Sequence, residues 1–331
     1  MTPPRGGPST AAVWAALATI YVVWGSTYLG IMVAIETLPP LLMSAARFVV
    51  AGAFLYVFAI RRGDRAGDRP TARQWVAATI VGGALLLGGN GGVALSEERI
   101  DSGVAALLVA TIPLWMAVLD RVLHGRRLAW RGVVGLVVGL VGVALLVGPS
   151  SGSIDVLGAL MALGAAFAWA WGSLYARDAT LPARPLVGAG MQMLAGGALL
   201  AVVGTAAGEV GDVHLEAVSA RSLVAVTYLV VVGSVIAYSA YVWLLKNAPT
   251  ALVSTYAYVN PVVAVALGAL VLAEPVTPRM LLAGLAIVVS VALIVTAQSS
   301  GEPVVERLRA RSASTKRLRR RLRRRPQGVR A

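Results

Sequence analysis

The stretch WGSTY at residues 24–28 decides the fold, because it returns as WGSLY at residues 171–175. Further matches keep nearly the same spacing. Pro113 and Pro261 lie 148 residues apart, and VALLV at residues 143–147 recurs as VALIV at the same distance. Each copy lies inside a long apolar stretch. The sequence therefore predicts two homologous halves, a pattern typical of membrane transporters with a substrate site where the halves meet.

The composition indicates a membrane protein. Of the 331 residues, 58% are hydrophobic and 13% are charged, whereas about a quarter of the residues in a soluble domain are charged. The apolar runs approach the ~20 residues that cross a bilayer. We expect ten spans, at residues 11–35, 40–60, 74–95, 102–119, 132–148, 156–176, 185–205, 222–245, 251–272 and 280–298.

The expected fold class is an all-α polytopic membrane protein whose ten transmembrane helices form two inverted five-helix repeats. Five spans are an odd number, so the second copy must cross the membrane in the opposite direction. The expected domains are residues 1–10 as a cytoplasmic N-terminus, 11–148 as the first repeat, 149–298 as the second, and 299–331 as a basic, disordered cytoplasmic tail.

The loop charges orient the chain. Basic residues fill the even-numbered loops, whereas the odd-numbered loops hold only Arg99, Arg221 and Arg279 among many acidic residues. Because short basic loops stay in the cytoplasm, we expect both termini on that side. Abundant Ala, Gly, Val and Arg with little Lys suggest a bacterial genome of high GC content, and hence the inner (plasma) membrane.

Several motifs inside the spans together carry a family resemblance. They are WGS at 24–26 and 171–173, LPP at 38–40, RF at 47–48, GGNG at 88–91, ATIPLW at 110–115, GSVIAY at 233–238 and YAYVNP at 256–261. In them the chain resembles the drug/metabolite transporter superfamily, specifically the EamA-repeat permeases and their YedA-like branch. The resemblance covers residues 11–298. It departs at Arg126, where many relatives carry Glu, whereas Glu274 keeps that residue in the second copy.

The resemblance implies ten helices, an inverted repeat and transport of small organic metabolites or drugs driven by a gradient. Export is the expected direction, by alternating access of the two halves. Two other classes stay open as alternatives. A polytopic membrane enzyme acting on lipid-borne substrates would need a cluster of Asp, Glu, His or Lys, and a non-transporting membrane scaffold would not need helix breaks in the middle of its spans.

Arg47 is the one charged side chain expected inside a span, roughly 10 Å from the outer end at ~1.5 Å per residue. An arginine in the membrane is costly unless it faces a partner or a wet cavity. It is a candidate anchor for a carboxylate or other anionic group of the substrate. The alternatives are a structural tie to backbone carbonyls or a side chain that reaches the outer interface.

Polar and aromatic residues inside the spans are the other candidates for substrate contact. Hydroxyl and aromatic walls suit amphipathic or aromatic organic solutes. The full set is Arg47, Asn90, Trp115, Gln192, Tyr238, Ser254, Tyr256, Tyr258 and Asn260. The alternative is a role between helices, or in the aromatic belt of the membrane interface, which we favour for Tyr241 and Trp243.

A further set is expected to pack helices or to act as hinges: Trp24, Gly25, Ser26, Pro113, Trp171, Gly172, Ser173 and Pro261. Small residues let helices approach closely in lipid. Proline removes a backbone hydrogen bond and kinks a helix, so Pro113 and Pro261 predict matching kinks in the fourth and ninth spans.

No Asp or Glu is expected inside a span, so coupling to protons has no obvious residue. Glu36 and Glu274, at outward span ends, are the nearest candidates. The chain has no Cys, which excludes thiolate sites, and we expect no metal, no cofactor and no catalytic residue.

The expected partners are a small organic solute and membrane lipids. The Arg-rich tail, residues 301–331, favours anionic lipid at the cytoplasmic face. We expect no binding of nucleic acid. A homodimer is left open.

Overall fold

The structure, a computed structural model, describes residues 9–62, 70–125, 130–147, 154–248, 250–253 and 255–300. Ser254, Arg126 and the basic tail therefore lie outside the described residues. Every regular element in the described ranges is a helix. Nine helical stretches there are long and apolar enough to cross a membrane, and a shorter apolar helix adds to them.

The first half has five spans. They are α1 (Thr10–Ile35), α2 (Pro40–Arg61), a composite of α3 (Ala72–Gly82), η1 (Gly83–Gly91) and α4 (Gly92–Glu97), a broken span of α5 (Ser102–Val109) and α6 (Ile112–His124), and α7 (Trp130–Val147).

The second half repeats this order. It has α8 (Val156–Asp178), α9 (Pro185–Ala206), two short 3₁₀ turns η3 (Glu209–Asp212) and η4 (Leu215–Ala217), a composite of α10 (Ala220–Tyr228), η5 (Leu229–Ile236) and α11 (Ala237–Asn247), the broken pair α12 (Thr250–Val253) and α13 (Tyr256–Leu272), and α14 (Pro278–Ser300).

Helix starts follow local chemistry. The side chains of Ser9, Asp155 and Ser219 each accept a hydrogen bond from a first-turn N–H of α1, α8 and α10. Thr71 and Gln74 form a capping box at α3. These contacts satisfy backbone donors that a helix leaves open at its N-terminus.

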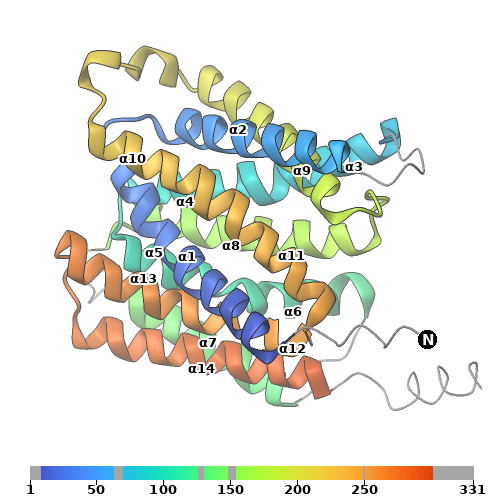
Figure 1. The fold of residues 1–331 in the computed structure, drawn as a ribbon. Helices are drawn as coiled ribbons and strands as arrows, with labels where there is room; N and C mark the ends of the chain where they lie inside the picture. The colour runs from blue at the N-terminus through green and yellow to red at the C-terminus, as the bar shows by residue number, and fades with distance from the viewer. Residues whose placement is uncertain are drawn as a thin grey trace, which may run out of the picture.

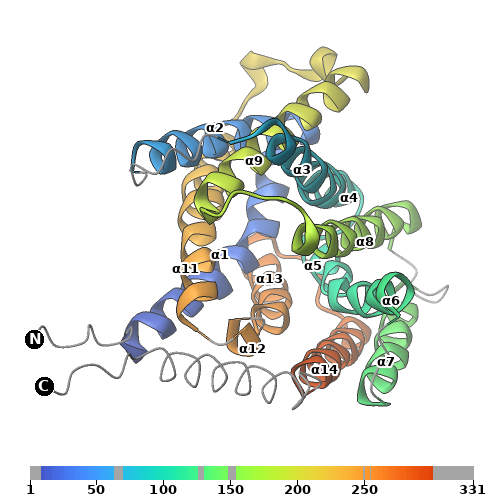
Figure 2. The ribbon, with the colours of Figure 1, turned by 90° about the vertical axis from the view of Figure 1, so that its right-hand side faces the viewer.

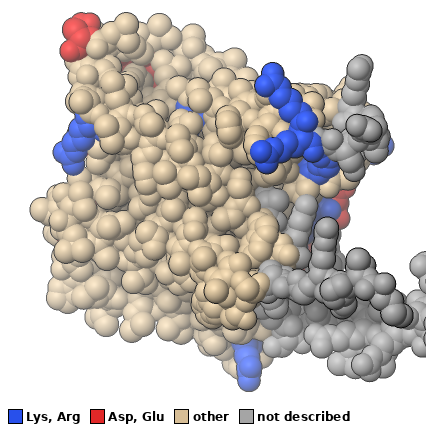
Figure 3. Space-filling view, viewed as in Figure 1, with Lys and Arg blue, Asp and Glu red and all other residues tan. Residues whose placement is uncertain are grey.

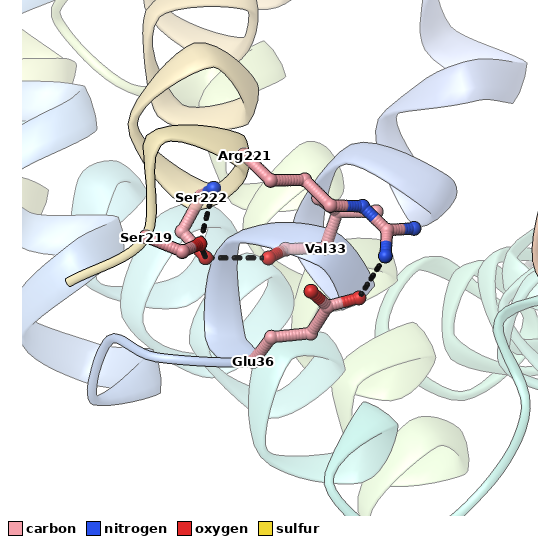
Figure 4. Close-up of polar contacts among 5 residues, drawn as sticks. All are labelled: Val33, Glu36, Ser219, Arg221 and Ser222. Atoms are coloured by element: carbon pink, nitrogen blue, oxygen red, sulfur yellow. Dashed lines mark hydrogen bonds and ion pairs between the residues drawn. The ribbon is translucent and has the colours of Figure 1, made fainter. Parts of the chain in front are cut away.

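The two halves run in opposite directions. At one end of the molecule, which we call the Glu36 end, Arg221 at the start of α10 forms an ion pair of 3.2 Å with Glu36 after α1 (Figure 4). At the same end, Arg99 after α4 lies 3.7 Å from Asp155 before α8. The first helix of one half thus ends where the first helix of the other begins, which confirms the inverted repeat (Figure 1).

Equivalent helices pair across the halves. Helix α2 packs against α9, and α7 packs against α14. These two pairs lie on opposite sides of the molecule in Figure 2. Between them, α1 packs against α13 while α8 packs against α5 and α6. The molecule therefore has an approximate two-fold arrangement, with α1 and α8 near its middle.

Glycines let the paired helices come into backbone contact. A Cβ on Gly82 would lie 2.4 Å from the carbonyl oxygen of Gln192, and one on Gly190 would lie 2.7 Å from the backbone nitrogen of Tyr56. Lipid provides no hydrophobic driving force between helices, so close van der Waals packing at small residues holds the helices together instead.

The helix breaks differ from the kinks expected at proline. The fourth span breaks at Ala110 and Thr111, and Pro113 lies in the first turn of α6, where its missing N–H costs nothing. Pro261 lies inside the continuous helix α13, and the ninth span breaks before it, at Thr255. Both Thr111 and Thr255 donate their hydroxyl to the carbonyl three residues earlier, which satisfies backbone groups freed by the break.

The surface is apolar across the spans. In the view of Figure 3, charged side chains gather towards the ends of the helices and leave most of the face between them without charge. Large apolar residues of the spans, such as Phe54, Leu140 and Leu285, are exposed, as expected for a surface that faces lipid.

Candidate functional site

Arg47 of α2 is buried inside the protein, with 5% of its surface exposed. Its Nε donates a hydrogen bond to the Ser234 hydroxyl in η5, at 3.0 Å. Its guanidinium carbon also lies 4.7 Å from the ring centre of Phe48. The side chain therefore does not reach the membrane interface, and its hydrogen-bond partner here is a hydroxyl rather than a carbonyl.

The eighth span is locally a π-helix where it meets Arg47. Its η5 segment has a counterpart in the third span, η1, at the matching place in the repeat. The Asn90 side chain donates to the Leu85 carbonyl within η1, at 3.3 Å. Such π-helical segments occur frequently at functional sites. Neither was predicted, because the apolar sequences VVVGSVI and ALLLGG have no feature that distinguishes a π-turn from an α-turn.

Hydroxyl groups join α1 to the eighth span beside Arg47. The hydroxyls of Ser26 and Tyr228 lie 2.5 Å apart, and Ser26 also donates to the Val23 carbonyl. Ser26 is buried. The packing residue expected from sequence thus also forms a polar contact between spans.

A cluster of four aromatic rings lies between α1, α11 and α13; we call Trp24, Tyr238, Tyr241 and Tyr256 the aromatic cluster. Trp24 contacts Tyr241 and Tyr256, with ring centres 5.1 and 5.2 Å apart. Tyr241 in turn contacts Tyr238 at 6.2 Å and Tyr256 at 6.0 Å. Tilted and edge-on rings at these distances attract one another.

Two expectations change here. Tyr241 belongs to the aromatic cluster and not to an interfacial belt, because the eighth span turns this residue inward against Trp24. Trp24, expected as a packing residue, is a wall of the same cluster. Its neighbour Gly25 lies against α13, where a Cβ would come within 2.6 Å of Val263.

The cluster adjoins Arg47 along one helix. Tyr238 follows Ser234 by four residues, so the two lie on one face of the eighth span. Tyr238 also packs against the core around Phe48 and Leu55 of α2. Asn260 lies at the other edge of the cluster, where its amide nitrogen donates to the backbone carbonyls of Tyr256 and Tyr21 at 3.1 and 3.2 Å in the orientation that satisfies the amide.

Three predicted residues lie elsewhere. Tyr258 packs with the core of the fourth, fifth and tenth spans, on a different side of α13 from Tyr256. Trp115 of α6 contacts Phe167 edge-on at 5.5 Å, and its indole nitrogen has no hydrogen-bond partner in the described ranges. Gln192 is half-buried in α9, opposite Gly82. Sequence could not separate these from the cluster, because all are polar or aromatic positions in apolar spans.

The second copy of the WGS motif has a different environment. Trp171 is 38% exposed and stacks on Tyr175 at 5.6 Å. Both line a groove of about 490 Å³ at the end of the molecule opposite to Glu36, between the third, fourth and sixth spans. Gly172 lies against Ala84 and Leu85, and Ser173 is half-buried. The repeat therefore preserves the motif but not its surroundings.

The two coupling candidates are both engaged at the Glu36 end. Glu36 forms the ion pair with Arg221. Both carboxylate oxygens of Glu274 accept backbone N–H groups at the start of α5, from Ser102 at 2.9 Å and Gly103 at 3.0 Å. Glu209 does the same for Leu41 and Leu42 at the start of α2. A carboxylate at a helix N-terminus is stabilising.

The expected spans left out one buried carboxylate at a helix end. Glu97, the last residue of α4, is 3% exposed, and its electrostatic neighbours are Glu274 and Arg47. The sequence suggested an exposed loop, because Glu97 is followed at once by Glu98, Arg99 and Asp101. The helix continues two residues beyond its apolar run, through Ser96 to Glu97, and Glu97 is buried there.

No group of three or more His, Cys, Asp or Glu residues that could hold a metal ion occurs in the described ranges.

The repeat also matches known proteins. The EamA-like transporter family matches residues 9–148 and again residues 156–296. This chain belongs to the EamA-like transporter family. It is therefore a multi-pass membrane transporter, and the enzyme alternative is excluded by the family.

Individual relatives agree with the family. The chain is 40% identical over 260 residues to "Uncharacterized inner membrane transporter YedA" of Escherichia coli (strain K12), covering 77% of this chain and 81% of the relative. It is 24% identical over 277 residues to "Probable amino-acid metabolite efflux pump" of the same strain, covering 78% and 86%. A crystal structure with 21% identity and a TM-score of 0.58 covers 89% of this chain and 100% of its own, and shares the fold.

Proposed function

We propose that this EamA-family transporter exports small organic solutes with a carboxylate group across the bacterial inner membrane. The observation that carries the proposal is a buried arginine, Arg47, whose partner Ser234 lies about one helix turn from the aromatic cluster. Arginine binds carboxylates through two parallel hydrogen bonds, and aromatic walls suit the organic part of the solute.

The inverted halves supply the mechanism. We place the solute path along α1, which packs on the eighth and ninth spans of the other half. Rocking of residues 11–148 against 149–298 would expose Arg47 and the aromatic cluster first to one side and then to the other. The name of one relative refers to efflux of amino-acid metabolites, which supports export and a solute with a carboxylate.

Transport in proteoliposomes against a panel of metabolites tests this function. In Arg47→Ala we expect uptake of carboxylate-bearing solutes to fall about 10–100-fold, because a hydrogen bond to a charged group is worth roughly 1.5–3 kcal/mol. Arg61→Ala, which changes an exposed arginine at the end of the same helix, should transport normally. Equal transport by both variants would remove Arg47 from the site.

The aromatic cluster has its own test. Tyr256→Ala opens the centre of the cluster and should weaken binding of aromatic solutes more than of aliphatic ones, whereas Tyr256→Phe keeps the ring and should change little. An equal loss for both classes of solute would mean that the cluster only holds α1 against α13.

The orientation follows from the loop charges. We place the Glu36 end outside and the opposite end, with Arg61, Arg62 and Arg184, in the cytoplasm. Reporter fusions at Ala179 and Asp212 should report opposite sides of the membrane. Two reporters on one side would overturn the orientation. In the proposed orientation, the basic tail lies in the cytoplasm, beside anionic lipid.

A further inference from the structure

Glu97 has no partner that explains its burial. Both of its carboxylate oxygens are inaccessible, and neither has a hydrogen-bond partner in the ranges that the structure describes. An ionised carboxylate buried in this way costs far more than a hydrogen bond returns, so such a group takes up a proton instead. By contrast, the buried Glu209 and the half-buried Glu274 each accept two backbone N–H groups. Glu97 is thus the exception among three similar carboxylates.

The charges around Glu97 come from three elements. Glu97 interacts electrostatically with Arg47 of α2 and with Glu274 after α13, and the Tyr28 hydroxyl of α1 interacts electrostatically with Glu97. Helix α4 also packs against η1, α5 and α8. Elements η1 and α5 contain no titratable side chain, and the titratable residues of α8 lie at the opposite end of that helix. Asp155, which precedes α8, forms an ion pair with Arg99. Glu274 is held by its backbone bonds, and arginine keeps its proton. Protonation of Glu97 is therefore the step that changes the local charge.

Arg47 and Glu97 interact without touching. No ion pair within 4.0 Å joins them among the described residues, and the Nε of Arg47 is bonded to Ser234 instead. A buried cation and a buried carboxyl group without a direct bond are chemically complementary to a solute that carries both a carboxylate and an ammonium group.

The pair occurs in one half only. Adding the repeat spacing of 148 to Arg47 leads to Ala195, and adding it to Glu97 leads to Leu245. The repeat preserves the helices and the packing glycines but not these two charges. A requirement of the fold would be expected in both halves, so the asymmetry points to a ligand.

We propose that Glu97 is a proton-exchange residue coupled to Arg47: a zwitterionic amino-acid-like solute binds its carboxylate to Arg47 and its ammonium to Glu97, and displaces the Glu97 proton. This inference rests on the proposed function and extends it. The O–H of the Glu97 carboxylic acid gives its proton to water in the path, and the ammonium group becomes the counter-ion of the carboxylate. Solute and proton then exclude each other, which is the condition for exchanging an inward proton for an outward solute.

The first experiment needs no solute. Infrared spectroscopy of the purified full-length protein should show a protonated carboxyl C=O band that disappears as the pH is raised. The band should be absent in Glu97→Gln and present in Glu98→Gln, which makes the same change at the exposed neighbouring residue. A band that persists in Glu97→Gln, or no such band in the wild type, overturns the assignment of the proton to Glu97.

The second experiment uses L-phenylalanine, which carries both charges and a ring suited to the aromatic cluster. Binding to the wild type should release one proton into a weakly buffered solution, and its affinity should rise about tenfold per pH unit while Glu97 is protonated. In Glu97→Gln the proton release and the pH dependence should both be lost. Since Gln has the shape of the protonated acid, we expect this variant to fold, and the wild-type proton count stands if it does not.

The outcomes separate the two proposals. If the wild type binds L-phenylalanine without releasing a proton, or does not bind it, the coupling is wrong. Transport of other carboxylate-bearing solutes that depends on Arg47 would still support the proposed function. If Arg47→Ala transports normally while Glu97 still titrates, the proposed function fails and the proton site remains.

Discussion

Replacement of Glu209 gives a direct measure of what the Glu36 end contributes to stability. Glu209 is buried after α9, and its two oxygens accept the N–H groups of Leu41 at 3.1 Å and Leu42 at 2.8 Å. Glu209→Ala leaves both donors at the start of α2 without a partner. Hydrogen bonds to a charged group are worth about 1.5–3 kcal/mol each, so the loss is about 3 kcal/mol or more.

Thermal unfolding in detergent, followed by tryptophan fluorescence, measures this loss. Because 1 kcal/mol corresponds to about 2–4 °C in a domain of 150–250 residues, we expect the midpoint to fall by about 6–12 °C. Glu209→Gln keeps one accepting oxygen and should lie between the variant and the wild type. Glu216→Ala removes an exposed glutamate from the same connection and is the matched control. If Glu209→Ala and Glu216→Ala unfold at the same temperature, the cap contributes nothing and the reasoning fails.

Three further expectations use the same fluorescence assay. Gly82→Ala should lower the free energy of unfolding by about 1–3 kcal/mol, since the new Cβ would lie 2.4 Å from a carbonyl oxygen of α9. Gly164→Ala, where a Cβ meets open space, should not lower it. A larger loss for Gly164→Ala than for Gly82→Ala would contradict the packing. Ser222→Ala breaks a buried 2.9 Å bond to the end of α1 (Figure 4) and should cost about 1 kcal/mol, more than Arg221→Ala, whose ion pair is exposed. Partial desolvation of this surface residue and the nearby Glu209 carboxylate raise the pKa of Glu98. Ionising Glu98 therefore costs more in the folded state, and stability falls as the pH rises through that window. Glu98→Gln should therefore be more stable than wild type at neutral pH and equal to it below pH ~4; a gain that is the same at both pH values would refute this.

Much of the architecture could be predicted from local signals. Spans such as 40–60 and 185–205 agree closely with α2 and α9, because length and apolarity alone determine what crosses a bilayer. The inversion of the halves followed from an odd number of spans in each repeat. Arg47 was recognisable as a candidate because a charge inside an apolar run is costly wherever the helix faces.

The surroundings of each side chain could not be predicted in this way. Trp24 and Trp171 belong to the same repeated motif, yet one lies inside the aromatic cluster and the other borders a surface groove. The difference arises from which helix lies opposite, and that helix comes from the other half of the chain. Tyr241 was likewise expected in the aromatic belt, and its inward position depends on Trp24 of the first span.

The sequence by itself thus determined the membrane class, the family and the inverted repeat, because hydrophobic length, loop charge and internal repetition are properties of the chain alone. Only the tertiary structure placed Glu97 inside the protein beside Arg47 and divided the carboxylates into two helix caps and one group without a partner. The physical reason is that burial and pairing depend on contacts between helices that are far apart in the sequence, and no local sequence pattern records those contacts.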